Sequence, residues 1–196
     1  MKLLLASNNS KKIKEMTGIC SDLGYELVRQ SDFAIREAIE DGLSFVENAI
    51  IKARHAANAT NLPTIADDSG LEVDALNGEP GIYSARYAGE KASDQANLEK
   101  LVASMSGQAI RSARYRCVIV MMRHAKDPMP IIAQGTWEGE IIQEPRGGGG
   151  FGYDPIFLVK GSSLTAAELS PEEKAKISHR GQALRQFHEQ LAQMSF

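Results

Sequence analysis

The start of the chain joins a strand signal, a turn and a helix signal in immediate succession, and this order most restricts the possible folds. Lys2–Ala6 is a short, mainly apolar run that is typical of a buried strand. Ser7-Asn8-Asn9-Ser10 follows, and its residue types favour a turn that caps a helix. Apolar residues then recur at helical spacing from Ile13 to Leu23. This strand–loop–helix unit predicts an α/β fold.

Further helices and strands are indicated along the rest of the chain. Ser44-Phe45-Val46-Glu47 fits a capping box, which predicts a helix to about Asn58. A third helix is expected over Asp94–Met105. The C-terminal helical region starts at a capped Ser170, and the spacing allows either one helix over Pro171–Gln193 or a break near Ser178. Apolar or alternating runs indicate strands at Tyr25–Val28, Pro63–Ala66, Leu71–Leu76, Arg114–Met122, Pro130–Thr136, Gly139–Gln143 and Pro155–Val159.

The amino-acid composition argues against several classes of protein. Lys+Arg is 22 against Asp+Glu 25, a net charge of -3, whereas a dedicated nucleic-acid binder normally carries a basic excess. Cys20 and Cys117 lie far apart, which indicates neither a disulfide framework nor a zinc knuckle. No apolar run reaches the roughly 18 residues of a membrane span, and the N-terminal one is too short for a signal peptide. We expect a cytoplasmic protein with one domain over residues 1–196, no membrane association and no stable nucleic-acid partner.

The loop Ser7-Asn8-Asn9-Ser10-Lys11-Lys12 is a candidate anion site. Backbone N–H groups and the dipole of a helix start attract anions, and the two lysines add positive charge. The loop therefore suits a triphosphate, although it lacks the Walker A pattern. An ordinary capped helix with solvated lysines fits the same residues.

Asp67-Asp68-Ser69-Gly70 is a candidate cation site at the end of an apolar strand. Ligands of open α/β sheets bind at such strand ends. Adjacent carboxylates repel each other unless a cation lies nearby, and Mg²⁺ accepts one or two carboxylates together with phosphate oxygens and water. Side chains 67 and 68 of a strand point to opposite faces, so only one is expected to reach the metal. Glu40 offers a second carboxylate, whereas a solvated turn is the alternative interpretation of the segment.

Two later segments offer groups that suit a flat ring. After the glycine run Gly147–Gly150, Phe151 could stack on such a ring and Asp154 could accept from its N–H groups. Lys174 and Ser178-His179-Arg180 bring donors that suit ring carbonyls or phosphates. The alternatives are a loop anchored by one aromatic residue and a charged, solvated helix start.

Taken in order, these segments resemble one known family. They are Ser7–Lys12, Ser44–Ala53 (SFVENAIIKA), Ala66–Leu71 (ADDSGL), Pro80–Gly89 (PGIYSARYAG), Gly149–Pro155 (GFGYDP) and Ala175–Ala183 (AKISHRGQA). The chain resembles the inosine triphosphate pyrophosphatase family over nearly its whole length, and within it the bacterial dITP/XTP pyrophosphatases. The resemblance implies a two-lobed α/β domain around a long mixed β-sheet with flanking helices and the active site in the central cleft.

The resemblance also implies an activity. Members hydrolyse the non-standard purine nucleotides ITP, dITP and XTP to the monophosphate and pyrophosphate, with Mg²⁺, as homodimers. This removes such nucleotides from the pool before they enter DNA and RNA. By the resemblance, the metal ligands are Glu40 and Asp68, and Asp68 is also the general base. The substrate-binding residues are Ser7, Asn8, Asn9, Ser10, Lys11, Lys12, Lys52, Ser69, Phe151, Gly152, Tyr153, Asp154, Lys174, His179 and Arg180.

The residue chemistry agrees with this activity and leaves other functions open. The 6-oxo group of hypoxanthine would accept from His179 or Arg180, whereas the amino group of adenine would face donors. Guanine shares the 6-oxo edge, so discrimination against GTP is not explained. The alternatives are a pyrophosphatase for pyrimidine nucleotides, a nucleotide sensor without turnover, and a single-strand binder that uses Phe151. Glu40 and Asp68 argue against the sensor, and the net charge argues against the single-strand binder.

Overall fold

The computed structural model describes residues 1–194, without the side chains of Ser10, Lys11 and Glu15. The predictions for the side chains of Ser10 and Lys11 therefore lie outside the described residues. The helices are α1 (Ser10–Asp22), α2 (Phe45–Thr60), α3 (Asp94–Ser104), α4 (Pro171–Ile177) and α5 (His179–Ala192). The strands are β1 (Lys2–Leu5), β2 (Glu26–Arg29), β3 (Thr64–Val73), β4 (Pro80–Gly81), β5 (Ser112–Met122), β6 (Ile131–Ile141) and β7 (Phe157–Val159).

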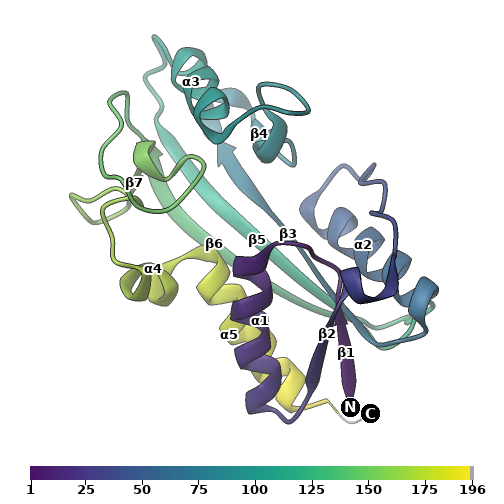
Figure 1. The fold of residues 1–196 in the computed structure, drawn as a ribbon. Helices are drawn as coiled ribbons and strands as arrows, with labels where there is room; N and C mark the ends of the chain where they lie inside the picture. Colours follow the sequence, from purple (N-terminus) through teal and green to yellow (C-terminus); the bar gives the residue numbers. More distant parts are fainter. Residues whose placement is uncertain (195–196) are drawn as a thin grey trace. The chain divides into compact units, whose positions relative to one another are not determined.

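The strands form one seven-stranded sheet in the order β2-β1-β3-β5-β6-β7, with β4 paired to β3 (Figure 1). β1 pairs in parallel with β2 and with β3, whereas β7 pairs antiparallel with β6. The predicted α/β class with a mixed sheet is confirmed. Among the described residues, no helix has the length and apolar character needed to cross a membrane.

β3 continues through Asp67-Asp68-Ser69-Gly70, where the composition indicates a turn. The strand runs without a break from Thr64 to Val73 and lies between β1 and β5 in the sheet. Turn propensity is a local preference, and pairing with strands that are distant in sequence overrides it. Only after Val73 does the chain enter a short 3₁₀ turn, Asp74–Leu76, so the predicted strand over Leu71–Leu76 ends early.

β6 is one strand where the sequence indicates two. Gly139 looks like a break, but a Cβ there would lie 2.5 Å from the carbonyl oxygen of Leu158 and 2.5 Å from Cζ of Phe157. Glycine at this position therefore permits the close approach of β7 instead of forming a turn. The open question in the C-terminal region is resolved in favour of a break, because the extended backbone of Ser178 separates α4 from α5.

The contacts divide the chain into two compact units, and the first contains Met1–Asp68, Cys117–Gln134 and the chain from Ala183 onward. In this unit α1 and α5 contribute to the same apolar core on one face of the strands, and α2 lies on the other side (Figure 1). The side chains that α2 buries are mostly alanines, which permit close packing. The core comprises Leu3, Leu5, Met16, Cys20, Ile65, Cys117, Ile119, Met121, Ile131, Ala133, Ala183, Phe187 and Leu191.

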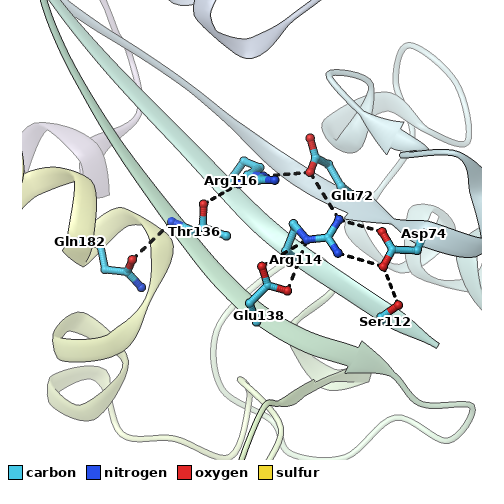
Figure 2. Close-up of polar contacts among 8 residues, drawn as sticks. All are labelled: Glu72, Asp74, Ser112, Arg114, Arg116, Thr136, Glu138 and Gln182. Atoms are coloured by element: carbon cyan, nitrogen blue, oxygen red, sulfur yellow. Dashed lines mark hydrogen bonds and ion pairs between the residues drawn. The ribbon is translucent and has the colours of Figure 1, made fainter. Parts of the chain in front are cut away.

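The second unit contains Ser69–Arg116 and Gly135–Gln182, and its sheet has one apolar and one charged face. The apolar face packs against α3 and against residues 151–156 before β7, which we call the aromatic loop. The larger side chains of this core are Leu71, Leu98, Leu101, Met105, Tyr115, Trp137, Tyr153, Ile156 and Phe157. On the other face, Arg114 donates to both oxygens of Asp74 and to Glu138, and Arg116 donates to Glu72 (Figure 2). Strand alternation explains the separation of the two faces.

The edge of β6 is bonded by side chains of α5. The backbone N–H of Gln134 donates to Oε1 of Gln186, and that of Thr136 donates to Oε1 of Gln182, as Figure 2 shows for the latter pair. Two residues of a strand advance about 6.6 Å and four residues of a helix about 6 Å, so the spacings match. α5 thereby satisfies backbone donors beyond the stretch that β7 pairs.

Candidate active site

The loop between β1 and α1 is held by its own side chains. Oγ of Ser7 accepts from the backbone N–H of Asn9, and Oδ1 of Asn9 accepts from the backbone N–H of Lys12. Asn9 thus caps α1, which confirms the predicted helix start. Nδ2 of Asn8 donates to Oε1 of Glu37 and ties the loop to the segment that precedes α2. An anion at this helix start would meet the positive end of the helix dipole.

Lys12 forms an ion pair with Asp67. Its Nζ lies 2.8 Å from Oδ2 of Asp67, whose side chain is only 2% exposed. The pair neutralises a carboxylate that would be costly to bury alone. Asp67 was not among the predicted site residues, and the alternation of the two aspartates along β3 is the signal that could have found it.

Lys52 joins the two carboxylates that the sequence suggests as metal ligands. Its Nζ lies 2.9 Å from Oε2 of Glu40 and 3.0 Å from Oδ1 of Asp68. Oδ2 of Asp68 is buried and has no hydrogen-bond partner. Burial raises the pKa of Asp68, although Lys52 opposes that shift. Burial would lower the pKa of Lys52, but Asp68 and Glu40 outweigh it and raise this pKa.

The segment that carries Glu40 is fixed by the first turn of α2. The backbone N–H of Gly42 donates to Oδ1 of Asn48 at 2.9 Å, and that of Leu43 donates to Oε2 of Glu47 at 3.0 Å. A Cβ at Gly42 would lie 2.7 Å from Oδ1 of Asn48, so glycine makes the first of these bonds possible. The predicted N-cap at Ser44 is present, because its side chain accepts from the backbone N–H of Glu47. The Glu47 side chain accepts from the backbone N–H of Leu43 and from the Ser44 hydroxyl, in place of the Ser44 backbone N–H of a capping box.

Several of these groups, though not Asp68, line a pocket of the first unit with a volume of about 260 Å³; its walls include Ser7, Asn9, Lys12, Glu40, Lys52 and Asp67. His55 also lines the pocket, with Nε2 2.8 Å from the carbonyl oxygen of Arg36. This contact holds the segment before Glu40 against α2. His55 was not predicted, and nothing in the sequence links it to residue 36.

The two carboxylates that Lys52 joins are a donor set that suits a magnesium ion. Among the described residues, no group of three or more His, Cys, Asp or Glu side chains is arranged to hold a metal. Mg²⁺ needs no such protein cage, because it takes one or two carboxylates and completes its shell with phosphate oxygens and water. Glu40 lines the pocket, and Asp68 is joined to Glu40 through Lys52, with its Oδ2 buried and without a hydrogen-bond partner.

In the second unit, Asp154 is the centre of the aromatic loop. Oδ2 accepts from the backbone N–H of Phe151 at 2.8 Å and from Nζ of Lys174, and Oδ1 accepts from the hydroxyl of Tyr115 at 3.3 Å. The side chain of Asp154 is 3% exposed, whereas Phe151 is 58% exposed. Nζ of Lys174 lies 5.1 Å from the centroid of the Phe151 ring. The loop therefore buries its carboxylate and presents its aromatic ring.

Gly152 and Tyr153 anchor the same loop. The backbone N–H of Gly152 donates to Oδ2 of Asp94 at 3.0 Å, and the hydroxyl of Tyr153 donates to the carbonyl oxygen of Ser84 at 2.8 Å. Tyr153 is 4% exposed and belongs to the apolar core of the unit. Both residues thus hold in place the backbone next to Phe151.

The start of α5 brings His179 and Arg180 into the second unit. The ring of His179 stacks on Tyr115 with centroids 4.8 Å apart and an interplanar angle of 11°. Nη2 of Arg180 donates to Oγ of Ser69 at 3.2 Å. Tyr115 therefore contacts both His179 and Asp154, and sequence reasoning missed it because it lies 39 residues from Asp154 in an ordinary strand pattern.

Comparisons with known proteins agree with this arrangement. The sequence pattern of the Ham1 family matches residues 3–190. A protein of Vibrio parahaemolyticus named dITP/XTP pyrophosphatase is 58% identical over 193 residues, which are 97% of this chain and 96% of that protein. The protein of the same name from Escherichia coli K12 is 56% identical over 94% of both chains.

Solved structures of the same family have the same fold. The HAM1 protein of Coxiella burnetii superposes with a TM-score of 0.96, at 49% identity, over 99% of this chain and 100% of that one. The nucleoside-triphosphatase, or dITP/XTP pyrophosphatase, of Mycobacterium abscessus gives a TM-score of 0.84 at 42% identity, over 97% of this chain and 100% of that one. The match covers nearly every residue and includes all segments on which the resemblance rests, so the chain belongs to the Ham1 family.

Proposed function

We propose that this chain is a nucleoside triphosphate pyrophosphatase that hydrolyses dITP, XTP and ITP to the monophosphate and pyrophosphate. The observation that carries the proposal is the pair of carboxylates, Glu40 and Asp68, held on one ammonium group of Lys52. Phosphoanhydride hydrolysis needs such charges, because a water must be oriented while negative charge on the phosphates is neutralised. The relatives named dITP/XTP pyrophosphatase support the substrate class. The cellular role would be to remove these nucleotides from the precursor pool.

The first unit supplies the groups that suit the triphosphate. Lys12 and Lys52 offer two ammonium groups, and the start of α1 offers its dipole. Ser7, Asn8 and Asn9 shape the loop through their side-chain hydrogen bonds. On binding, phosphate oxygens would take over the lysine contacts that carboxylates make in the structure.

We propose Glu40 and Asp68 as the magnesium ligands. Magnesium bound there would supply charge neutralisation at the phosphate oxygens. Asp68 is also the residue suited to orient or deprotonate the attacking water, because its Oδ2 has no partner and burial raises its pKa. Lys52 keeps the two carboxylates together at the start of the reaction.

A separate set of residues suits the purine. The exposed ring of Phe151 offers a stacking surface, and Lys174, His179 and Arg180 offer donors. A 6-oxo purine would accept from these donors, whereas the 6-amino group of adenine would leave a donor facing donors. Ser69 orients the guanidinium of Arg180.

The proposal is tested by measuring pyrophosphate release from ITP, dITP, XTP, GTP, ATP and dTTP, with Mg²⁺ and with EDTA. The expected result is magnesium-dependent release from the first three nucleotides and slow release from the others. Preference for dTTP would instead support a pyrimidine pyrophosphatase. Absence of release from every nucleotide would contradict the proposal.

The assigned role of Asp68 is tested separately. Asp68→Asn is expected to lower kcat at least about 1000-fold, in line with the loss of a base and a ligand together. Circular dichroism should stay that of the wild type. The exposed Asp22→Asn is the control for the loss of one carboxylate charge, and it should retain full activity. A wild-type rate for Asp68→Asn would refute the role.

We also propose that the protein works in the cytoplasm as a homodimer, as the resemblance to the family implies. Light scattering of the purified chain measures its mass directly. A mass near twice 21.3 kDa is expected. A monomer with full activity would reject the homodimer.

A further inference from the structure

We infer that Asp154 is a positioning residue that acts on the purine through Lys174 and the backbone of Phe151, and does not itself contact the purine. The inference rests on the proposed function for its substrate. It assigns to Asp154 a task that differs from accepting hydrogen bonds from a ring, which is what its residue type suggests.

The first argument is the hydrogen-bond capacity of the carboxylate. Its two oxygens offer about four acceptor positions. Three are used, by the hydroxyl of Tyr115, the backbone N–H of Phe151 and Nζ of Lys174. The side chain is 3% exposed, so the remaining position is not presented to a ligand. A purine could reach this carboxylate only by displacing one of the three bonds.

The second argument is the packing of Gly150 against the same carboxylate. Gly150 has a φ of +75°, and a Cβ built on it would lie 2.0 Å from Oδ2 of Asp154. Glycine is therefore needed both for the backbone angle and for the space that Asp154 occupies. The last glycine of the run, Gly150, thus packs directly against the Asp154 carboxylate.

The third argument is what the bonds of Asp154 hold in place. Lys174 projects from the short helix α4, and its ammonium group lies against the exposed Phe151 ring. Asp154 bonds both the ammonium group and the backbone of Phe151. One buried carboxylate thus fixes a donor and a stacking surface relative to each other, and this is the geometry that a purine site requires.

Tyr115 supports the carboxylate from the core. Burial and the charge of Asp154 raise the pKa of Tyr115 well above its ordinary value, so its hydroxyl is protonated and donates. Among the rings packed against Tyr115 is that of His179, which stacks on it. Tyr115 therefore links the Asp154 carboxylate to His179, which is a second predicted purine donor.

A double-mutant cycle between Asp154 and Lys174 tests the inference. Asp154→Asn, Lys174→Met and the double variant are compared by KM and kcat for dITP. If Asp154 acts through Lys174, each single variant raises KM about tenfold, corresponding to ~1.4 kcal/mol, and leaves kcat within about twofold. The double variant should then be no worse than the worse single variant. Independent effects that multiply to about 100-fold would overturn the inference, because Asp154 would then affect the purine without acting through Lys174.

A second readout needs no substrate and separates this inference from the proposed function. Hydrogen exchange of the Phe151 amide, followed by NMR, should be protected in the wild type and at least about tenfold faster in Asp154→Asn. Equal protection in both would refute the positioning role even if dITP is hydrolysed. Faster exchange in a protein that hydrolyses none of the nucleotides would reject the function alone. The matched control is Glu172→Gln, an exposed carboxylate on α4, which should change neither measurement.

Tyr115→Phe keeps the test valid if Asp154→Asn does not fold. This variant removes one hydroxyl and retains the ring that stacks on His179. It should raise KM about threefold and lose that effect in the Lys174→Met background. A threefold effect that persists in that background would count against the inference.

Discussion

Nζ of Lys52 lies 3.0 Å from Oδ1 of Asp68, so an ammonium group already neutralises the carboxylate that is proposed to hold magnesium. The same ammonium group lies 2.9 Å from Glu40, the second proposed ligand. The two cations therefore compete for the same two carboxylates. Nucleotide phosphates can relieve this competition, because they offer Lys52 other anionic partners.

Removing Lys52 should strengthen metal binding while it weakens catalysis. In Lys52→Met, the affinity for Mn²⁺ without nucleotide should rise about tenfold, equivalent to ~1.4 kcal/mol, because the competing charge is gone. Turnover of dITP should fall at least about 100-fold, since a phosphate contact is lost. Electron paramagnetic resonance of free Mn²⁺ measures the first effect. Lys126→Met, an exposed charge change, should alter neither quantity, and an unchanged Mn²⁺ affinity in Lys52→Met would exclude the competition.

The neighbouring aspartates of β3 should differ in how much stability their loss of charge costs. Asp67→Asn breaks a buried ion pair with Lys12 and should lower the free energy of unfolding by roughly 2–3 kcal/mol. Asp68→Asn should change it by less than about 1 kcal/mol, because burial already disfavours the charged form of Asp68. Urea denaturation of both variants provides the comparison. A larger loss of stability in Asp68→Asn than in Asp67→Asn would contradict the assignment of partners.

The local parts of the fold were predictable because their causes are local. The Ser44 cap and the break at Ser178 follow from a few neighbouring residues, although spacing alone could not decide the break. The strand through Asp67-Asp68-Ser69-Gly70 was not predictable, since turn-forming residues are overruled by pairing with distant strands. The predicted start of a new strand at Gly139 was wrong for a similar reason, because the neighbour that Gly139 accommodates, Phe157, comes from another strand.

The candidate site also has features that the sequence indicates and features that only the fold reveals. Residue types and order pointed to Glu40, Lys52 and Asp68, and the structure brings these three together. Asp154 was singled out as an acceptor for ring N–H groups, but its burial is a property of packing that no spacing reveals. The ring of Tyr115 was hidden within an ordinary strand, and only the fold places it against His179 and Asp154.

Acid should weaken the charged face of the second unit. The hydrogen bonds from Arg114 hold the pKa of Asp74 at about 2, below the value of about 3.9 in an unfolded chain. The stabilisation is therefore complete above about pH 4 and is lost as the pH falls toward 2. Because Asp74 is 38% exposed, solvent screening limits the effect to about 1 kcal/mol or less.

Urea midpoints at pH 6, 4 and 3 measure this acid sensitivity. The wild type should lose more stability between pH 4 and pH 3 than Asp74→Asn, which has no carboxylate to protonate. Asp22→Asn, an exposed aspartate on α1, should follow the wild type. Parallel pH profiles for wild type and Asp74→Asn would show that the Arg114 contact adds nothing measurable.

Two glycines of one run should tolerate a methyl group differently. Gly150→Ala forces a side chain onto a φ of +75° and into Asp154, and should lower the free energy of unfolding by roughly 1–3 kcal/mol. It should also raise KM for dITP about tenfold, equivalent to ~1.4 kcal/mol. Gly148 has no heavy atom within 4 Å of a built Cβ, so Gly148→Ala is the matched control and should be near neutral. Thermal melts and KM values decide the comparison, and equal behaviour of the two variants would refute it.

The glutamines of α5 also limit how copies of this chain can assemble. A strand from another molecule adds to a sheet by bonding to exposed backbone N–H groups. At Gln134 and Thr136 those groups already donate to Gln186 and Gln182. A helix thus takes the place that an incoming strand would need, and joining two sheets along this stretch of β6 would require breaking both bonds. Extension of the sheet along this stretch is therefore disfavoured as a way for two copies of the chain to associate.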